Sequence, residues 1–142
     1  MSSPRRRRIE SQSAPCHVLL GRKLIRAEPD SGSAELEFEA RPEFENGMGR
    51  IQGGFVAAML DSVMGAALST VLMEDEAPPT LELKVSFVRG AEAGRLVGRA
   101  RVVHKGRSAA FVEGELSTPG GELLATSSAT AILVRVEPPG AR

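Results

Sequence analysis

The sequence predicts an α+β domain in which one long buried helix packs on an antiparallel sheet. The first observation is a run of small and apolar residues from 53 to 73, which has few polar groups and predicts a helix that is apolar on nearly all sides. The second is the alternation of apolar and polar residues from residue 81 onward, broken by turn sequences, which is typical of antiparallel strands. Helix and strands are thus segregated, as in α+β folds.

The composition is that of one ordinary domain. The chain has 142 residues, of which 42% are hydrophobic and 25% charged, and this is enough for a single core. Lys plus Arg equals Asp plus Glu at 18 each, so the net charge favours neither nucleic acid nor a membrane surface. The single cysteine, Cys16, excludes an internal disulfide framework and a cysteine metal cluster. Because no signal-peptide pattern is present, we expect a cytoplasmic protein.

We expect three segments along the chain. Residues 1–15 are rich in Ser, Pro and Arg, with four arginines at 5–8, and have no apolar period, so they predict a disordered basic tail. Residues 16–137 form the folded domain. Residues 138–142 form a short tail.

Six strands are expected in the folded domain. Two precede the helix as a hairpin, one beginning near Val18 and one over 34–40, joined by the turn sequence Pro29-Asp30-Ser31-Gly32. Four follow the helix and are expected to pair as an antiparallel meander. Their ranges are 81–87, 96–103, 108–117 and 122–136.

The helix and its start carry the candidate chemistry. Asp61 is the only formally charged residue between Arg50 and Glu74, and a carboxylate among apolar residues is costly unless it is paired or used. The glycines before the helix allow close approach to its N-terminus, whose free N–H groups suit an anion or an oxyanion. Gly53 and Asp61 are eight residues apart, about 12 Å along a helix. One small group cannot touch both, so a two-fold dimer with antiparallel helices is the simplest way to join them.

The stretch from Asn46 to Gly65, with Asn-Gly-x-Gly-x-x-Gln-Gly-Gly before an apolar run and Asp61, resembles the central motif of hotdog-fold acyl-CoA thioesterases. The resemblance is to the phenylacetic-acid-catabolism type, relatives of 4-hydroxybenzoyl-CoA thioesterase. It implies a curved sheet of five to six strands around the central helix. It also implies that Asp61 is the general base or nucleophile, that the Gly53 N–H polarises the thioester carbonyl, and that Asn46 and Thr80 help to hold the carbonyl or the water.

One position departs from this pattern, because many relatives have His where this chain has Gln52. Gln can position a group by hydrogen bonding but carries no proton at neutral pH, so an acid role is not expected. Further residues are candidates for binding the acyl or coenzyme A part of the substrate, the basic ones because Arg and Lys suit phosphate, although ordinary surface charge explains them equally well. These are Gly54, Met64, Arg89, Lys105, Gly106 and Arg107.

The expected function is hydrolysis of an acyl-CoA thioester by a homodimer or dimer of dimers, with no metal or redox cofactor and with coenzyme A as part of the substrate. The main alternative is a non-enzymatic acyl-CoA or small-ligand binding dimer, which Gln52 favours; an interaction module without a ligand is weaker. Hotdog dehydratases need a histidine paired with a carboxylate, and neither His17 nor His104 lies in the helix or its entry loop. A membrane-spanning helix is rejected because Asp61 lies in its middle. A structural hydrogen bond is the competing role for Asp61.

Overall fold

The computed structural model describes residues 14–137. The predicted tails therefore lie outside the described residues, except for Ala14 and Pro15, and their predicted disorder stays a prediction. None of the described helices is long and apolar enough to cross a membrane.

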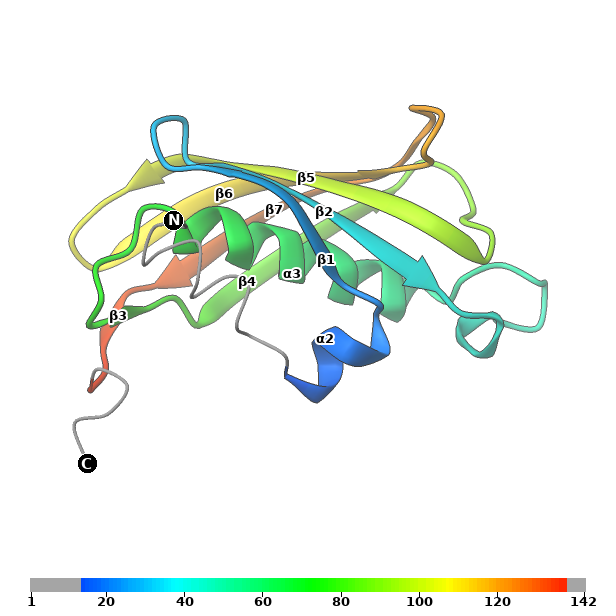
Figure 1. The fold of residues 1–142 in the computed structure, drawn as a ribbon, viewed down its shortest axis with the longest axis horizontal. Helices are drawn as coiled ribbons and strands as arrows, with labels where there is room; N and C mark the ends of the chain where they lie inside the picture. Colours follow the sequence, from blue (N-terminus) through cyan, green and yellow to red (C-terminus); the bar gives the residue numbers. More distant parts are fainter. Residues whose placement is uncertain (1–13, 138–142) are drawn as a thin grey trace.

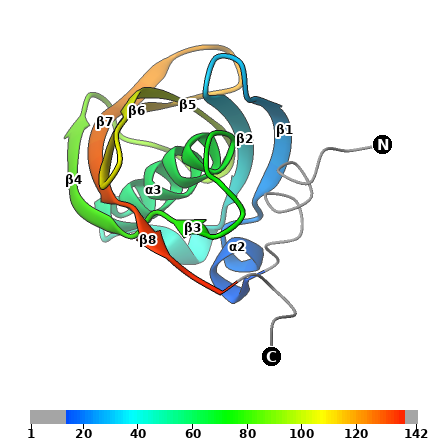
Figure 2. The same cartoon turned by 90° about the vertical axis from the view of Figure 1, so that its left-hand side faces the viewer.

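A curved sheet of six antiparallel strands wraps around one long helix, α3 (Gly53–Ser69) (Figures 1 and 2). The strand order is β1-β2-β5-β6-β7-β4. This arrangement confirms the predicted α+β class and the hotdog fold. The strands are β1 (Lys23–Glu28), β2 (Ser33–Ala40), β4 (Thr80–Phe87), β5 (Gly94–Lys105), β6 (Ala109–Ser117) and β7 (Leu123–Ile132).

The predicted meander is wrong for β4. β5, β6 and β7 pair in sequence order, but β4 lies at the sheet edge beside β7, and β5 pairs instead with β2. The crossover has a physical reason, because α3 connects β2 to β4 beneath the concave face and so brings the chain out at the far edge of the sheet (Figure 2). β4 is consequently an edge strand.

Several boundaries also differ from the prediction. The first strand was expected to begin near Val18, but that residue lies in a helix and β1 begins at Lys23. α3 ends at Ser69 rather than at residue 73, and the buried Thr70 follows it as C-cap. The predicted strand 122–136 is split, because after β7 the short β8 (Val134–Arg135) leaves the large sheet and pairs with β3 (Glu76–Ala77). A short helix, α2 (Pro15–Leu19), was not expected; proline at its first position favours a helix start. A 3-10 turn, η1 (Pro42–Phe44), precedes the glycine loop.

The core lies between α3 and the concave face of the sheet. Met59, Leu60 and Val63 of α3 are fully buried. Glycine in the strands lets the helix approach closely, because a Cβ at Gly98 would lie 3.2 Å from Val63 and one at Gly114 would lie 3.0 Å from Met64. The sheet therefore positions α3 tightly.

The opposite face of α3 is open in the single chain, in contrast to the predicted burial of the whole helix. Gly54, Ala58 and Asp61 are exposed and follow one another along this face. The edge strand β4 borders it and leaves Phe87 58% exposed. The open face, defined by these residues, therefore combines small side chains with an unpaired strand edge.

Candidate active site

Asp61 and Thr80 meet at the border of the open face. Asp61 lies in the middle of α3, and Thr80 is the first residue of β4. The Thr80 hydroxyl donates a hydrogen bond of 2.9 Å to Asp61 Oδ1. The sheet topology helps to produce this pair, since β4 follows α3 in the chain and pairs with β7 at the edge of the sheet that wraps the helix. One carboxylate oxygen is thus held by a neutral donor, and the carboxylate faces solvent.

The start of α3 leaves one backbone donor free. Gln52 is the N-cap of the helix, and its Oε1 accepts a hydrogen bond of 2.8 Å from the Gly54 N–H. The Gly53 N–H, one residue earlier, has no acceptor among the residues that the structure describes. The Gln52 side chain therefore accepts the Gly54 N–H and leaves the Gly53 N–H available for a ligand, at the positive end of the helix dipole.

A phenylalanine lies directly against this free donor. A Cβ built on Gly53 would be 3.1 Å from Cζ of Phe87, the last residue of β4. The two ends of β4 thus contact the two chemical groups of α3: Thr80 contacts Asp61, and Phe87 contacts Gly53. Sequence reasoning missed Phe87, because a phenylalanine at an alternating strand position is typical of a core residue.

Asn46 organises the loop before the helix. Its Oδ1 accepts hydrogen bonds from the backbone N–H of Met48, at 2.9 Å, and of Arg50, at 3.2 Å. Gly49 in the same loop has a φ of 73°, a backbone conformation that residues other than glycine rarely adopt. In the single chain the Asn46 side-chain oxygen therefore serves the loop.

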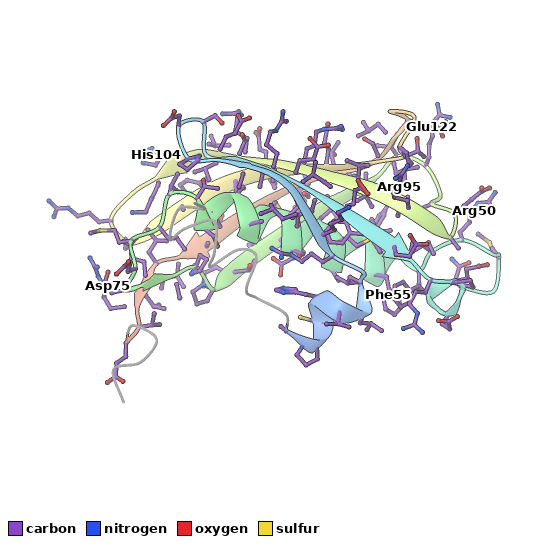
Figure 3. The ribbon with its side chains drawn as sticks, viewed as in Figure 1. Arg50, Phe55, Asp75, Arg95, His104 and Glu122 are labelled. Carbon is purple, nitrogen blue, oxygen red and sulfur yellow. The ribbon has the colours of Figure 1, made fainter. Side chains whose placement is uncertain are left out.

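The predicted basic residues lie at two ends of the domain. Arg89 contacts Glu122 at 3.4 Å, near the start of α3, whereas Lys105 lies next to His104 at the other end of the sheet (Figure 3). Gly106 is half-buried and Arg107 exposed in the same hairpin as Lys105. One chain therefore does not bring these residues together as a single phosphate site. Met64 is buried against β6 and does not reach the open face.

A buried carboxylate at that other end was not foreseen from the sequence. Glu76 in β3 is 4% exposed, accepts a hydrogen bond of 2.9 Å from the Met73 N–H, and forms an ion pair of 3.1 Å with Lys105. The backbone hydrogen bond from Met73, followed by the contact with Lys105, lowers the pKa of the Glu76 carboxyl. Lys105 is thereby tied to the ribbon that β3 and β8 form.

Arg22 lies just before β1, the strand at the opposite edge of the sheet from β4, and contacts α3. Its Nε donates a hydrogen bond of 3.1 Å to Oγ of Ser62 in α3, and burial lowers the pKa of its guanidinium. Within residues 14–137, no three His, Cys, Asp or Glu residues gather closely enough to hold a metal ion.

The comparisons with known proteins agree on one family. The family model of the thioesterase superfamily matches residues 48–125. A solved structure of a candidate thioesterase from Ralstonia eutropha JMP134, a phenylacetic acid degradation-related protein, is 36% identical with a TM-score of 0.84, covering 92% of this chain and 99% of that one. A thioesterase family protein of Silicibacter pomeroyi is 26% identical with a TM-score of 0.84, covering 92% and 98%.

The PaaI protein of the E. coli phenylacetic acid degradation operon has the same fold, at 19% identity and a TM-score of 0.77, covering 88% of this chain and 92% of that one. The comparison with curated proteins gives no significant match. The chain therefore belongs to the thioesterase superfamily, as a hotdog-fold protein similar to a phenylacetic acid degradation-related thioesterase.

Proposed function

We propose that the protein hydrolyses an acyl-CoA thioester to the free acid and coenzyme A, in a homodimer whose sites each combine Asp61 of one chain with Gly53 of the other. The observation that carries this proposal is the position of the two groups. The Gly53 N–H is free, Asp61 is exposed, and both border the open face of α3. They are about 12 Å apart along one helix, so a single carbonyl cannot contact both within one chain.

A two-fold axis near Ala57 would join them. If two copies of α3 pack antiparallel about this point, residue 53 of one chain faces residue 61 of the other. Gly54 and Ala58 are small enough for the two helices to approach closely. The exposed edge of β4 lies beside the helix and would meet its own copy in the same dimer, which supports this arrangement.

In each proposed site the thioester carbonyl oxygen accepts a hydrogen bond from the Gly53 N–H, and the helix dipole stabilises the negative charge that develops there. Thr80 holds Asp61 Oδ1, which leaves Oδ2 for the reaction. In one route Oδ2 takes a proton from water, the water oxygen bonds to the acyl carbon, and the C–S bond breaks. The coenzyme A thiolate leaves and takes up the proton that Asp61 accepted, which restores the carboxylate. In the other, Oδ2 itself attacks and displaces the thiolate, and water then hydrolyses the mixed anhydride.

The same dimer would bring the two basic regions closer together. Antiparallel pairing about Ala57 turns the end of one chain that carries Lys105, Gly106 and Arg107 toward the end of the other that carries Arg89. We assign the coenzyme A phosphates to this shared region, with Arg107 as the exposed cation of its hairpin. The proposed reaction uses no metal or redox cofactor. A dimer of dimers is compatible with it but not needed.

Release of free thiol from a panel of aryl and fatty acyl-CoAs tests the proposal, with wild type and Asp61→Asn measured side by side. We expect turnover by wild type and its loss in the variant, which keeps the shape of the side chain but removes the charged base. A variant with most of the wild-type rate would refute the role of Asp61.

A non-enzymatic binding dimer is the second candidate, and Gln52 is the residue that favours it. It would show as stoichiometric binding of acyl-CoA by a folded wild type that releases no thiol from any member of the panel.

A further inference from the structure

We infer that Phe87 is a specificity-determining residue that makes the enzyme select thioesters without a branch at the carbon next to the carbonyl. This inference rests on the proposed function. It begins from the contact between the Phe87 ring and Gly53, which the catalytic proposal does not use. The distal ring atoms Cζ and Cε1 lie 3.1 and 3.3 Å from where a Gly53 Cβ would be.

The direction of this contact places the ring beside the oxyanion donor. In an α-helix the Cα–Cβ bonds tilt toward the N-terminus. A ring that would meet a Cβ at Gly53 therefore lies toward the end of α3 where the free N–H points. A carbonyl oxygen bound to that N–H would have the ring of Phe87 at its side.

Exposure and position together distinguish Phe87 from the other aromatic residues. It is 58% exposed in the single chain, and it belongs to the open face. The chain has five phenylalanines and neither Trp nor Tyr, and all five lie within the described residues. Of the others, Phe38 and Phe44 are buried, Phe55 stacks on Phe44, and Phe111 points away from the helix between the buried Ala110 and Val112.

An aromatic ring beside the Gly53 N–H would distinguish acyl groups by their shape. An unbranched acyl chain, or a planar aromatic acyl group, can extend from the carbonyl carbon within the plane of the carbonyl group. A second substituent on the adjacent carbon projects out of that plane. It then points either to the side from which the partner's Asp61 approaches or to the side that Phe87 closes. Both sides are occupied in the proposed site, so overlap disfavours branched thioesters relative to unbranched ones.

Pairs of substrates that differ by one methyl group test this inference. Suitable pairs are hexanoyl-CoA with 2-methylhexanoyl-CoA, and phenylacetyl-CoA with 2-phenylpropanoyl-CoA. The quantity measured is the ratio of kcat/KM for the unbranched and the branched member. Comparing this ratio between variants cancels the lower intrinsic reactivity of branched thioesters. We expect Phe87→Ala to lower the ratio by about tenfold relative to wild type.

Two further variants complete the design. Phe87→Leu keeps apolar bulk but lacks the distal ring atoms, so it should lower the ratio in the same direction even if the alanine variant folds poorly. Phe111→Ala is the matched control, because Phe111 is also half-exposed, at 47%, but lies on the outer face of the sheet. It should leave the ratio unchanged. Size-exclusion chromatography of each variant reports whether its oligomeric state is preserved.

The outcomes separate the inference from the function on which it rests. A lower ratio in both Phe87 variants, with Phe111→Ala at the wild-type value, supports the inference. An unchanged ratio, or equal losses for both substrates with a changed oligomeric state, shows that Phe87 only packs in an interface and overturns it, while activity that depends on Asp61 still stands. A folded wild type that releases no thiol refutes both.

Discussion

The hydroxyl of Thr80 fixes one oxygen of the Asp61 carboxylate, and this contact can be removed with little change in shape. Thr80→Val deletes the donor of the 2.9 Å hydrogen bond. A hydrogen bond to a charged group contributes about 1.5 to 3 kcal/mol, so we expect kcat for thioester hydrolysis to fall by at least about tenfold. KM and the melting temperature should change little, because Thr80 is exposed and makes its contact at the edge of the domain.

Thr126→Val is the matched control for this prediction. Thr126 pairs with Ser86 on the outer face of the sheet, away from α3. Steady-state kinetics of both variants check the prediction. Full kcat in Thr80→Val would mean that the hydrogen bond holds the strand end and not the reactive carboxylate.

At the scale of residues, the sequence singled out Gly53, Asp61 and Thr80; in the structure Thr80 hydrogen-bonds Asp61, and the Gly53 N–H has no acceptor among the described residues. Their roles stay predictions. The sequence did not identify Phe87 or Arg22 as site residues, because each contacts a segment that is distant in the chain. Alternation places Phe87 on the helix side of a strand, but it does not say which residue of the helix the side chain will meet.

At the scale of elements, glycine in β5 sets how closely α3 lies on the sheet. A Cβ at Gly98 would lie 3.0 Å from Cε2 of Phe38 and 3.2 Å from Val63, and both neighbours are fully buried. Neither can move away easily, so Gly98→Ala overpacks the core and should cost about 1 to 3 kcal/mol of unfolding free energy. Gly47→Ala is the control, because a Cβ there meets nothing within 4 Å. Denaturant unfolding measures both, and equal stabilities would contradict this account of the helix position.

The ribbon of β3 and β8 depends on the buried carboxylate of Glu76, which predicts a pH-dependent stability. The pKa of Glu76 is lowered in the folded state, so the unfolded chain binds the proton more readily. The stabilisation is therefore present above the unfolded pKa, about 4.3, and is lost as the pH falls through the lower folded pKa. We expect Glu76→Gln to lower the unfolding free energy at pH 7 by about 1.5 to 3 kcal/mol, and this difference to shrink below pH 4.

Urea unfolding of wild type and Glu76→Gln between pH 7 and pH 3 measures this difference. The control is Glu113→Gln, which removes an exposed pair with Arg101 and should cost less than about 1 kcal/mol at any pH. A loss in Glu76→Gln that is the same at pH 3 as at pH 7 would show that the side chain acts through its packing and not through its charge.

The elements themselves were largely predictable. Polar and apolar alternation located β2, β4, β5, β6 and β7, and the glycines with Gln52 marked the start of α3 at Gly53. The first strand was placed too early, because Val18 lies in α2 and β1 begins at Lys23. The end of the helix was placed too late, because residues 70–72 are apolar or buried but no longer helical. α2 and the ribbon of β3 and β8 were missed, since two to five residues are too few for a periodic pattern to stand out.

At the scale of the whole molecule, the strand order could not be derived from alternation. A strand pattern gives the buried face but not the neighbour, so β4 was predicted beside β5, whereas the structure places it at the edge beside β7. This difference has consequences for the site. At this edge β4 contacts both Asp61 and Gly53, and its unpaired side lies beside the open face of α3 (Figure 2).

The central claim, that each site combines two chains, is tested most directly by mixing two inactive variants. Asp61→Asn removes the carboxylate, and Gly53→Pro removes the oxyanion donor at the first helical position, which proline favours. The proline Cβ would lie 3.1 Å from Cζ of Phe87, so the exposed Phe87 ring must shift to accommodate it. Each alone should lose at least about a hundredfold in thiol release. After co-refolding, a mixed dimer has one site with both native groups, so thiol release should recover to about a quarter of the wild-type rate if half of the dimers are mixed. Mixtures that stay as inactive as either variant alone, although mixed dimers form, would contradict the claim.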